Sequence, residues 1–458
     1  MLNVAGKKIT VLGLARSGVA AANLLVQKGA EVTVTDMKTE AALSKHLAKL
    51  DKRVKLCLGG HSDELFVNPD LIIISPGIPL TIPPVIKAQK AGKKIISELE
   101  LAYRMTEIPF IAIGGTNGKT TTTTLVGELL KAAGLNVSVG GNIGFAACQA
   151  LMDNPGADYW VTEVSSFQTD TIEQFRPYIA LLLNITPDHL DRYPTYADYI
   201  AAKARLFLNQ TEKDFAILNA DDPLVLKAAH GTRAVKFLFS RLQDLPEGIM
   251  VRGGRIMIKW EGLSSEICSI DDLGIQGTHN VENALAASAA AVICGMSSPL
   301  IKKVLAGFQP LEHRMEFVTY FNGITFINDS KGTNIGAVFK SLDSFDQPIV
   351  LIAGGKDKGG DFSSLEELVK ERVRNVVLIG EATAKFKEDL PAVQDKLHEA
   401  DTMQNAVRKA FALAQKGDVV LLSPACASFD MFENYEERGR IFKAAVKNLE
   451  QEVTGERA

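Results

Sequence analysis

Short apolar runs recur along this chain, and each leads into a glycine or serine turn and then into a segment with helical spacing. The first run, residues 9–12, precedes the turn GLARSG and a predicted helix over residues 19–28, which Gly29 is placed to end. Strands that alternate with helices are joined by crossovers, which makes the strands parallel. The pattern therefore predicts an α/β fold of mostly parallel sheets flanked by helices.

The pattern starts again twice within the 458 residues, a length that suits two to four domains. Residues 110–113 predict the strand that begins the second series. The predicted strands of a third sheet are residues 324–327, 349–352, 376–379 and 419–422. We expect boundaries near residues 98 and 310, which give domains of residues 1–98, 99–309 and 310–458, the first and third Rossmann-like.

Composition excludes several classes of protein. The chain has 50 basic and 54 acidic residues and a formal net charge of −4, so neither nucleic acid nor an acidic membrane is an expected partner. Its five cysteines lack CxxC spacing, which is typical of reduced thiols. No secretory signal is visible, and no apolar run approaches the ~18 residues of a membrane span. We expect a cytoplasmic enzyme without membrane insertion.

The segment GGTNGKTT, residues 114–121, lies between a predicted strand and a predicted helix, as a phosphate-binding loop requires. Glycines let backbone N–H groups approach phosphates, and the helix N-terminus adds partial positive charge. Lys119 would neutralise phosphate oxygens, and Thr120 would bind Mg²⁺. Ile113 stands where the strict pattern has its first glycine, so this is a shortened GxxGKT form. The alternative is a glycine-rich turn with an incidental Lys-Thr pair.

Polar residues follow two other predicted strands of the second series. Glu163 ends an apolar run, where a Mg²⁺ ligand belongs in phosphate-loop enzymes, although alone it suits an exposed strand end. The segment NITPDHLDRY places Asp188, His189 and Asp191 just past a strand, which is typical of a site, or of a solvated turn capped by Asp188. Lys203, on a helix that begins near residue 197, is by default an exposed helix lysine.

Two asparagines begin an alanine-rich helix that Gly295 should end. Asn280 and Asn283 are three residues apart, so both project from one face of the first turn and could bind a nucleotide base or ribose. Helix capping explains Asn280 equally well, but it explains Asn283 less easily.

Three loops of the third segment, residues 328–334, 354–360 and 423–430, each follow a predicted strand. Because ligands bind at the carboxyl ends of parallel strands, we expect these loops to line one crevice. In the first segment, residues 13–18 followed by Asp36 approximate the dinucleotide fingerprint, with Ala15 in place of the middle glycine. Alone, this motif is weak evidence for a nucleotide-binding site.

The motifs GGTNGKTT, EVSSFQ, NITPDHLDRY, HNVENALAA, EHRME, NDSKGTN and LSPACASFD, in this order, closely resemble the Mur ligases. Within that family, GLARSG and SPGI are most similar to the branch that adds D-glutamate to UDP-N-acetylmuramoyl-L-alanine (UDP-MurNAc-L-Ala). The resemblance covers essentially the whole chain. It implies a UDP-sugar domain, a central ATPase domain and a Rossmann-like amino-acid domain, and an ATP-dependent amide ligase of cytoplasmic peptidoglycan precursor synthesis. We expect a monomer.

The resemblance also implies site residues. Those for ATP are Gly115, Thr116, Asn117, Gly118, Lys119, Thr120, Thr121, Asn280, Asn283, Arg314 and Asp329. Those for Mg²⁺, two ions in this family, are Thr120, Glu163, His189 and a carbamylated Lys203. Those for the UDP substrate are Ser17, Ser75, Gly77, Asn142, Gln168 and His189. Those for D-glutamate are Thr333, Lys358, Ser428, Phe429 and Tyr435.

Some of these roles stay open. Lys356 or Lys358 could face the amino acid, and alignment favours Lys358. Arg16 and residues 36–38 fall where the family varies, so little is carried over there. The catalytic residues would be Lys119, His189 and Lys203. His189 is better interpreted as a metal or substrate ligand than as an obligatory general base.

The resemblance implies an acyl-phosphate mechanism, and other readings compete with it. Other muramyl ligases and folylpolyglutamate synthetase share the central motifs, but the latter normally lacks a domain like residues 1–98. An NAD-dependent oxidoreductase would explain residues 13–18 but not the phosphate loop. A phosphate-loop regulatory protein would hydrolyse ATP without any amino acid.

Overall fold

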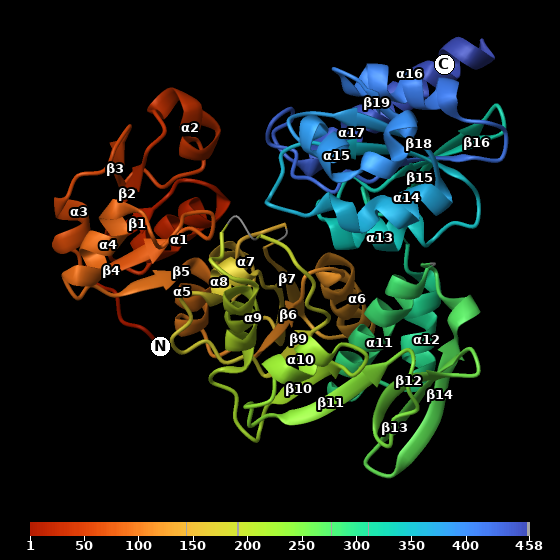
Figure 1. Ribbon diagram of the computed structural model, residues 1–458. Helices are drawn as coiled ribbons and strands as arrows, with labels where there is room; N and C mark the ends of the chain where they lie inside the picture. Colours follow the sequence, from red (N-terminus) through yellow and green to blue (C-terminus); the bar gives the residue numbers. More distant parts are fainter. Residues whose placement is uncertain (143, 190–191, 276, 310, 456–458) are drawn as a thin grey trace. The chain divides into compact units, whose positions relative to one another are not determined.

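The computed structural model describes residues 1–142, 144–189, 192–275, 277–309 and 311–455. Within them the chain forms three sheets, each flanked by helices, which confirms the predicted three-domain α/β architecture (Figure 1). The chain divides into two compact units. The first holds Met1–Ile185, Ala197–Leu273 and Asn280–Gly307, and the second holds Thr186–Tyr196, Gly274–His279 and Phe308–Ala458.

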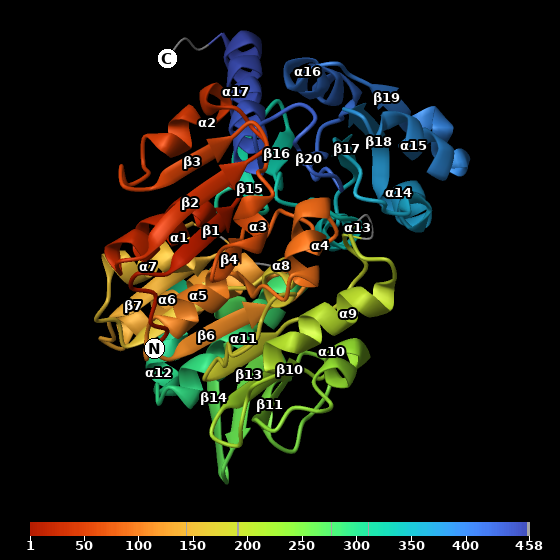
Figure 2. The same cartoon turned by 90° about the vertical axis from the view of Figure 1, so that its left-hand side faces the viewer.

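The first sheet has five parallel strands in the order β3-β2-β1-β4-β5, and Figure 2 labels β3, β2, β1 and β4 within it. Its elements are β1 (Lys8–Leu12), α1 (Arg16–Gln27), β2 (Glu31–Asp36), α2 (Glu40–Leu47), β3 (Lys55–Leu58), α3 (Glu64–Val67), β4 (Leu71–Ile74), α4 (Pro83–Lys90), β5 (Ile95–Ser97) and α5 (Glu98–Arg104). The strand order reverses between β1 and β4, the place where such sheets bind ligands. Helix α1 begins earlier than predicted, because Gly18 lies inside its first turn.

The second sheet has the order β14-β13-β12-β11-β10-β9-β6-β8-β7, and only its β12–β13 and β13–β14 pairs are antiparallel within the described residues. Its strands are β6 (Phe110–Gly114), β7 (Val137–Gly141), β8 (Tyr159–Glu163), β9 (Ile179–Leu182), β10 (Phe215–Asn219), β11 (Val235–Ser240), β12 (Gly248–Arg252), β13 (Arg255–Trp260) and β14 (Leu263–Ser269). Its helices are α6 (Lys119–Ala132), α7 (Ala147–Asp153), α8 (Ser166–Thr169), α9 (Tyr196–Ala204), α10 (Pro223–Ala228), α11 (Thr278–Ile293) and α12 (Ser298–Gly307). Strand β6 is buried along its whole length, as expected of a continuous apolar run between two parallel neighbours.

The third sheet has the order β15-β16-β20-β17-β18-β19, parallel except for β15. Its elements are β15 (Glu316–Phe321), β16 (Ile324–Asn328), α13 (Ile335–Leu342), β17 (Ile349–Gly354), α14 (Glu366–Arg372), β18 (Val373–Ile379), α15 (Thr383–Asp389), β19 (Leu397–Glu399), α16 (Met403–Leu413), β20 (Val419–Leu422) and α17 (Tyr435–Thr454). The four strands predicted for this sheet are β16, β17, β18 and β20.

This sheet has an apolar core on each face. Val338 of α13 and Phe386 of α15 belong to one core, and Val407 of α16 and Phe442 of α17 belong to the other. Because β16, β20 and β17 are parallel neighbours in the sheet, their carboxyl ends lie side by side. Among the described helices, none is long and apolar enough to cross a membrane.

Candidate active site

The predicted phosphate loop connects β6 to α6 in the second sheet. Asn184, just beyond β9, anchors it: its Oδ1 accepts the N–H of Thr116 (3.2 Å) and of Asn117 (2.8 Å), and its Nδ2 donates to the Asn117 carbonyl (3.1 Å). Lys119 curls over the loop and donates to the carbonyls of Gly115 and Thr116 at 3.0 and 2.8 Å. The loop is thus held in shape with an ammonium against it, an arrangement suited to phosphate oxygens.

Glu163 lies at the end of β8, beside β6, and is only 2% exposed. One carboxylate oxygen accepts the Thr120 hydroxyl at 2.7 Å, and the other accepts Nδ2 of Asn142 at 2.8 Å. The alternative that Glu163 is an exposed strand-end charge is therefore wrong. A carboxylate beside a threonine hydroxyl offers the hard oxygen ligands that Mg²⁺ prefers, so this donor set fits the metal.

The default interpretation of Lys203 as an exposed helix lysine is wrong. Lys203 is 5% exposed, and its Nζ donates to the Gly115 carbonyl at 2.7 Å. The reason is how α9 packs: Tyr199, one turn earlier, is also buried, and its hydroxyl bonds to the Thr116 hydroxyl at 3.0 Å. A cavity of about 10 Å³ beside Lys203 is lined also by Gly115 and Ser166, and it is about large enough for one water molecule.

Asn280 and Asn283 share one face of α11, as predicted. Nδ2 of Asn283 donates to Oδ1 of Asn280 at 3.1 Å, and the Thr122 hydroxyl of α6 donates to Oδ1 of Asn283 at 3.3 Å. The helix begins at Thr278, so the interpretation of Asn280 as its cap is wrong. The contact brings this motif against the phosphate loop: a methyl group at Gly118 would lie 2.3 Å from Oδ1 of Asn283.

The turn after β1 lies against the end of β4, where the first sheet reverses its strand order. The Ser75 hydroxyl donates to the Gly13 carbonyl at 3.1 Å, and a methyl group at Gly18 would lie 1.9 Å from that same oxygen. Oδ2 of Asp36 accepts the N–H of Leu14 at 2.8 Å. The side chain that would bind a ribose in a dinucleotide enzyme is thus engaged by the turn itself.

The three loops predicted to line one crevice meet at the edge of the third sheet. The Ser423 hydroxyl after β20 donates to Asp329 after β16 at 3.0 Å, and the Gly354 N–H at the end of β17 donates to the Pro424 carbonyl at 2.8 Å. Asp329 is fully buried, and burial raises the pKa of its carboxyl group. The predicted shared edge is confirmed.

The loop after β17 carries Lys358, whose Nζ lies 2.8 Å from Oδ1 of Asp188. Nδ2 of Asn334 donates to the other oxygen of Asp188 at 2.9 Å. Burial alone would raise the pKa of Asp188, but Lys358 and His189 outweigh it and lower that pKa to about 2. The side chain of Asp188 is 8% exposed, so the solvated-turn alternative is wrong. Asp191 lies outside the described residues.

Comparison with known proteins places the chain in a family. Three family models match it: the Mur ligase MurD-like N-terminal domain at residues 7–97, the Mur ligase middle domain at residues 113–291 and the Mur ligase glutamate ligase domain at residues 313–426. A UDP-N-acetylmuramoylalanine–D-glutamate ligase of Geotalea uraniireducens (strain Rf4) is 48% identical over 450 residues, which cover 98% of this chain and 99% of that protein. The chain belongs to the Mur ligase family.

Further relatives agree with this assignment. A ligase of the same name from Pelotomaculum thermopropionicum is 46% identical over 447 residues, which cover 97% of this chain and 98% of that protein. Two solved structures share the fold, both from Thermotoga maritima. UDP-N-acetylmuramate-alanine ligase MurC is 18% identical, with a TM-score of 0.61 and coverage of 97% of this chain and 100% of that one. MurF ligase in complex with ADP is 15% identical, with a TM-score of 0.59 and coverage of 97% and 96%.

In this Mur ligase the predicted nucleotide and metal residues fall in both compact units. The phosphate loop, Glu163, Lys203 and the Asn280–Asn283 pair belong to the first unit, whereas His189 belongs to the second. The predicted metal pairing of His189 with Lys203 therefore stays a prediction. Arg314 also lies in the second unit, with its Nη1 3.9 Å from Oδ1 of Asp329.

The residues predicted for the UDP substrate differ in their surroundings. Ser17 is half-buried and Gly77 is exposed, next to the buried Ser75. Gln168 is buried and is already engaged, because its Oε1 accepts the N–H of Ser165 at 3.0 Å in a capping box of α8. Its amide therefore shapes the turn after β8.

The residues predicted for D-glutamate lie around the edge of the third sheet. Thr333 is half-buried in the loop after β16, and Ser428 is buried in the loop after β20. Phe429 is 71% exposed. Tyr435 begins α17, and its hydroxyl accepts Nζ of Lys331 at 3.2 Å. Lys356 is exposed, whereas Lys358 is held by Asp188.

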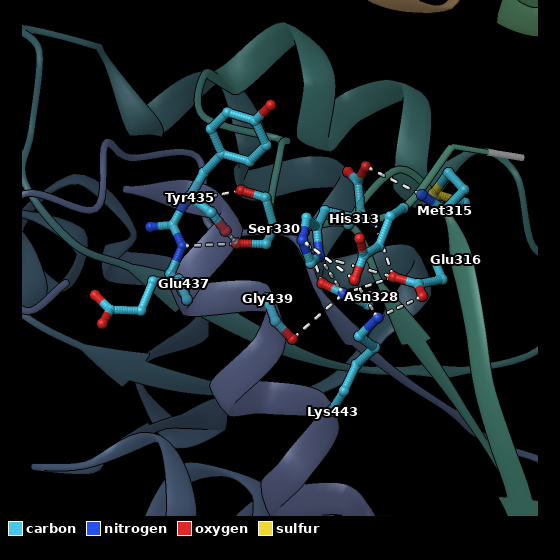
Figure 3. A network of polar contacts seen from close by, with 12 residues as sticks. His313, Met315, Glu316, Asn328, Ser330, Tyr435, Glu437, Gly439 and Lys443 are labelled. Carbon is cyan, nitrogen blue, oxygen red and sulfur yellow. Dashed lines mark hydrogen bonds and ion pairs between the residues drawn. The ribbon is translucent and has the colours of Figure 1, made fainter. Parts of the chain in front are cut away.

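A polar network around His313 and Asn328 was not predicted from the sequence (Figure 3). His313 is buried, and its Nδ1 lies 3.0 Å from Nδ2 of Asn328, which also donates to Glu316 at 2.9 Å. A methyl group at Gly439 of α17 would lie 2.3 Å from Nδ1 of His313, so only glycine admits the imidazole there. Lys443 donates to Glu316 at 2.8 Å. The network joins β15, β16 and α17, so its role is structural.

Arg438 was also missed. It is fully buried in α17 and donates to the carbonyls of Ser330 (2.8 Å), Cys426 (3.2 Å) and Ala427 (3.3 Å), which ties the loops after β16 and β20 together. Burial lowers its pKa to about 10. A signal was available, because Arg438 precedes Phe442 by four residues and so extends the apolar face of the helix.

Proposed function

We propose that this Mur ligase uses ATP to join D-glutamate to UDP-MurNAc-L-Ala in peptidoglycan precursor synthesis. The observation that carries the proposal is the 2.7 Å contact between Thr120 and Glu163 beside the phosphate loop, since it pairs a metal-binding hydroxyl with a buried carboxylate. The relatives that match over nearly their whole length bear the name of this activity.

The reaction must activate a carboxylate, because a carboxylate resists attack by an amine. Its oxygen first attacks the γ-phosphorus of ATP, which gives an acyl phosphate and releases ADP. The neutral amine of D-glutamate then attacks the carbonyl carbon. A C–N bond forms, the amine loses a proton, and the C–O bond to phosphate breaks, releasing inorganic phosphate.

The residues of the chain act in the first step mainly by position and charge. Lys119 and the loop N–H groups would exchange their present contacts for phosphate oxygens and offset the charge on the transferred group. Mg²⁺, as two ions in our proposal, would supply positive charge to neutralise phosphate oxygens when bound. Thr120 and Glu163 would hold one ion, and His189 and Lys203 would serve the other.

We further propose that Lys203 is carbamylated. Its amine, once neutral, would attack CO₂, form an N–C bond and lose a proton, which converts a cation into a carboxylate-like group. This change would remove a positive charge that repels Mg²⁺. The cavity of about 10 Å³ supports the proposal, because Lys203 lines it next to the phosphate loop.

Each sheet has its own role in this proposal. Residues 1–98 would bind the UDP sugar, residues 99–309 would bind ATP, and residues 310–458 would bind the amino acid. The nucleotide residues are those of the phosphate loop with Asn280, Asn283, Arg314 and Asp329. The UDP-substrate residues are Ser17, Ser75, Gly77, Asn142, Gln168 and His189. The D-glutamate residues are Thr333, Lys358, Ser428, Phe429 and Tyr435. We also propose a cytoplasmic monomer.

Phosphate release with a panel of amino acids tests the proposed function. We expect release only when ATP, Mg²⁺, UDP-MurNAc-L-Ala and D-glutamate are all present, with L-glutamate and D-alanine as controls. Release without any amino acid would contradict the proposal and favour a regulatory ATPase. Release with another amino acid alone would assign the chain to another branch of the family.

A further inference from the structure

One carboxylate of this chain lies where a substrate carboxylate is expected. Oδ1 of Asp188 accepts from Lys358 at 2.8 Å, and Oδ2 accepts from Asn334 at 2.9 Å, so both oxygens are engaged. All three residues belong to the second compact unit. Lys358 is assigned to the D-glutamate site in the proposed function, and Asn334 directly follows Thr333, which is assigned to it too.

The loop that carries Lys358 is held in place by contacts that do not involve Asp188. The neighbouring Asp357 accepts Nζ of Lys385 at 2.8 Å and the N–H of Gly360 at 3.1 Å, and Lys385 also donates to the Gly360 carbonyl. Lys356, on the other side, exchanges two backbone hydrogen bonds with Ala427 at 2.9 and 3.0 Å. The loop is fixed on both sides of Lys358, so the backbone of Lys358 would keep its position if Asp188 moved away.

The burial of Lys358 gives the contact a physical reason. Its side chain is 16% exposed, and an ammonium removed from water is costly unless a negative group stays beside it. Exchange of one carboxylate for another keeps the ammonium paired throughout. An acidic amino acid can make that exchange, whereas an amino acid without a second carboxylate leaves the ion pair intact.

We propose that Asp188 occupies the substrate-carboxylate position at Lys358 until D-glutamate displaces it, which makes Asp188 a residue that sets affinity for the amino acid. The proposal rests on the proposed function. Because Asp188 precedes His189, displacement also releases the segment that carries His189 from Lys358. Amino-acid binding and the placement of His189 are then linked.

The test measures D-glutamate binding to the full-length enzyme by calorimetry, with UDP-MurNAc-L-Ala and a non-hydrolysable ATP analogue present. We expect Asp188→Asn to lower the Kd for D-glutamate by about tenfold, the size of one charge-assisted hydrogen bond that no longer competes. Asp418→Asn is the matched control: it breaks the ion pair between the buried Asp418 and the half-buried Arg374 in the third sheet, and it should leave that Kd unchanged. An unchanged or higher Kd for Asp188→Asn, in protein with an intact unfolding transition, overturns the proposal.

A structure of the wild-type enzyme with D-glutamate provides a second measurement that needs no variant. We expect a substrate carboxylate on Lys358, with Asp188 moved beyond hydrogen-bonding distance. Asp188 still bonded to Lys358 in that complex would overturn the exchange. Phosphate release that does not depend on D-glutamate would instead reject the proposed function, so the two failures are distinguishable.

Discussion

The β1–α1 and β6–α6 units share one backbone plan, a parallel strand, a glycine turn and a helix, but they surround the turn with opposite charge. In the first, the Asp36 carboxylate accepts the N–H of Leu14 within the turn. In the second, the neutral amide of Asn184 accepts the corresponding loop N–H groups, and the ammonium of Lys119 lies over the loop.

The comparison indicates that the glycines determine the shape of each turn, whereas the neighbouring side chains determine which ligand charge the turn accepts. A carboxylate beside the turn repels a phosphate group at that point, so under the proposed function the first turn would bind an uncharged part of the UDP substrate. A neutral anchor with an added cation suits a triphosphate. Of the following four variants, three test that distinction and Lys203→Ala tests the metal site beside the second turn.

Lys119→Ala should have the largest effect. We expect ATP turnover to fall by about 10³-fold or more, because a cation that stabilises the transferred phosphoryl group is lost. Affinity for the UDP substrate should hardly change, since the first turn is untouched. Phosphate release and calorimetry measure the two effects. Lys131→Ala, on the exposed end of the same helix, is the control. Normal product formation by Lys119→Ala would reject the phosphate-loop assignment.

Lys203→Ala comes next. We expect an almost inactive enzyme that short-chain carboxylates partly rescue, because they would replace the carbamate group. The measurement is phosphate release with and without added acetate or formate. Lys227→Ala, an exposed lysine at the end of α10, should retain full activity. Full activity of Lys203→Ala without any carboxylate would remove the carbamate from the mechanism.

Gly18→Ala should damage the first turn alone. The added methyl group would meet the Gly13 carbonyl at 1.9 Å, and backbone cannot yield as a side chain does. We expect a loss of about 1–3 kcal/mol of stability, as in other overpacked sites, and weaker UDP-substrate binding with an unchanged KM for ATP. Thermal unfolding and binding titrations check this. Gly156→Ala, with no atoms within 4 Å of the new methyl group, is the control. An equal loss of ATP affinity would contradict the separation of the two turns.

Asp36→Asn should have the smallest effect. It removes a charge but preserves the size of the side chain, so we expect about 1 kcal/mol less stability, the usual worth of one such hydrogen bond. The UDP-substrate affinity should change by less than about tenfold. ATP kinetics should stay the same. Binding of ATP at the first turn is measured in the double variant Asp36→Asn, Lys119→Ala. If that protein bound ATP there, the charge of Asp36 would be the main barrier to phosphate binding at the first turn.

Much of the architecture was predictable because it depends on local pattern. Apolar runs followed by glycine turns predicted the parallel sheets, and the spacing of Asn280 and Asn283 predicted their shared helix face. The start of α1 was predicted too late, since a glycine was taken as part of the turn when tight packing places it inside the helix. Arg438 was missed because a single arginine on an apolar helix face does not reveal by itself that it is buried. Its carbonyl partners come from loops that are distant in the sequence.

The sequence by itself determined the strand–turn–helix units, the phosphate loop and the order of motifs that marks the Mur ligase family, because each of these depends on residues close together in the chain. Only the tertiary structure decided whether Glu163, Lys203 and Asp188 are buried and which groups they contact. Glu163 meets Thr120 because β8 lies beside β6, and Lys203 is buried because α9 packs on the loop. Asp188 meets Lys358 across 170 residues of chain. Burial and pairing of charge depend on which strands become neighbours, and crossover connections make those neighbours distant in sequence.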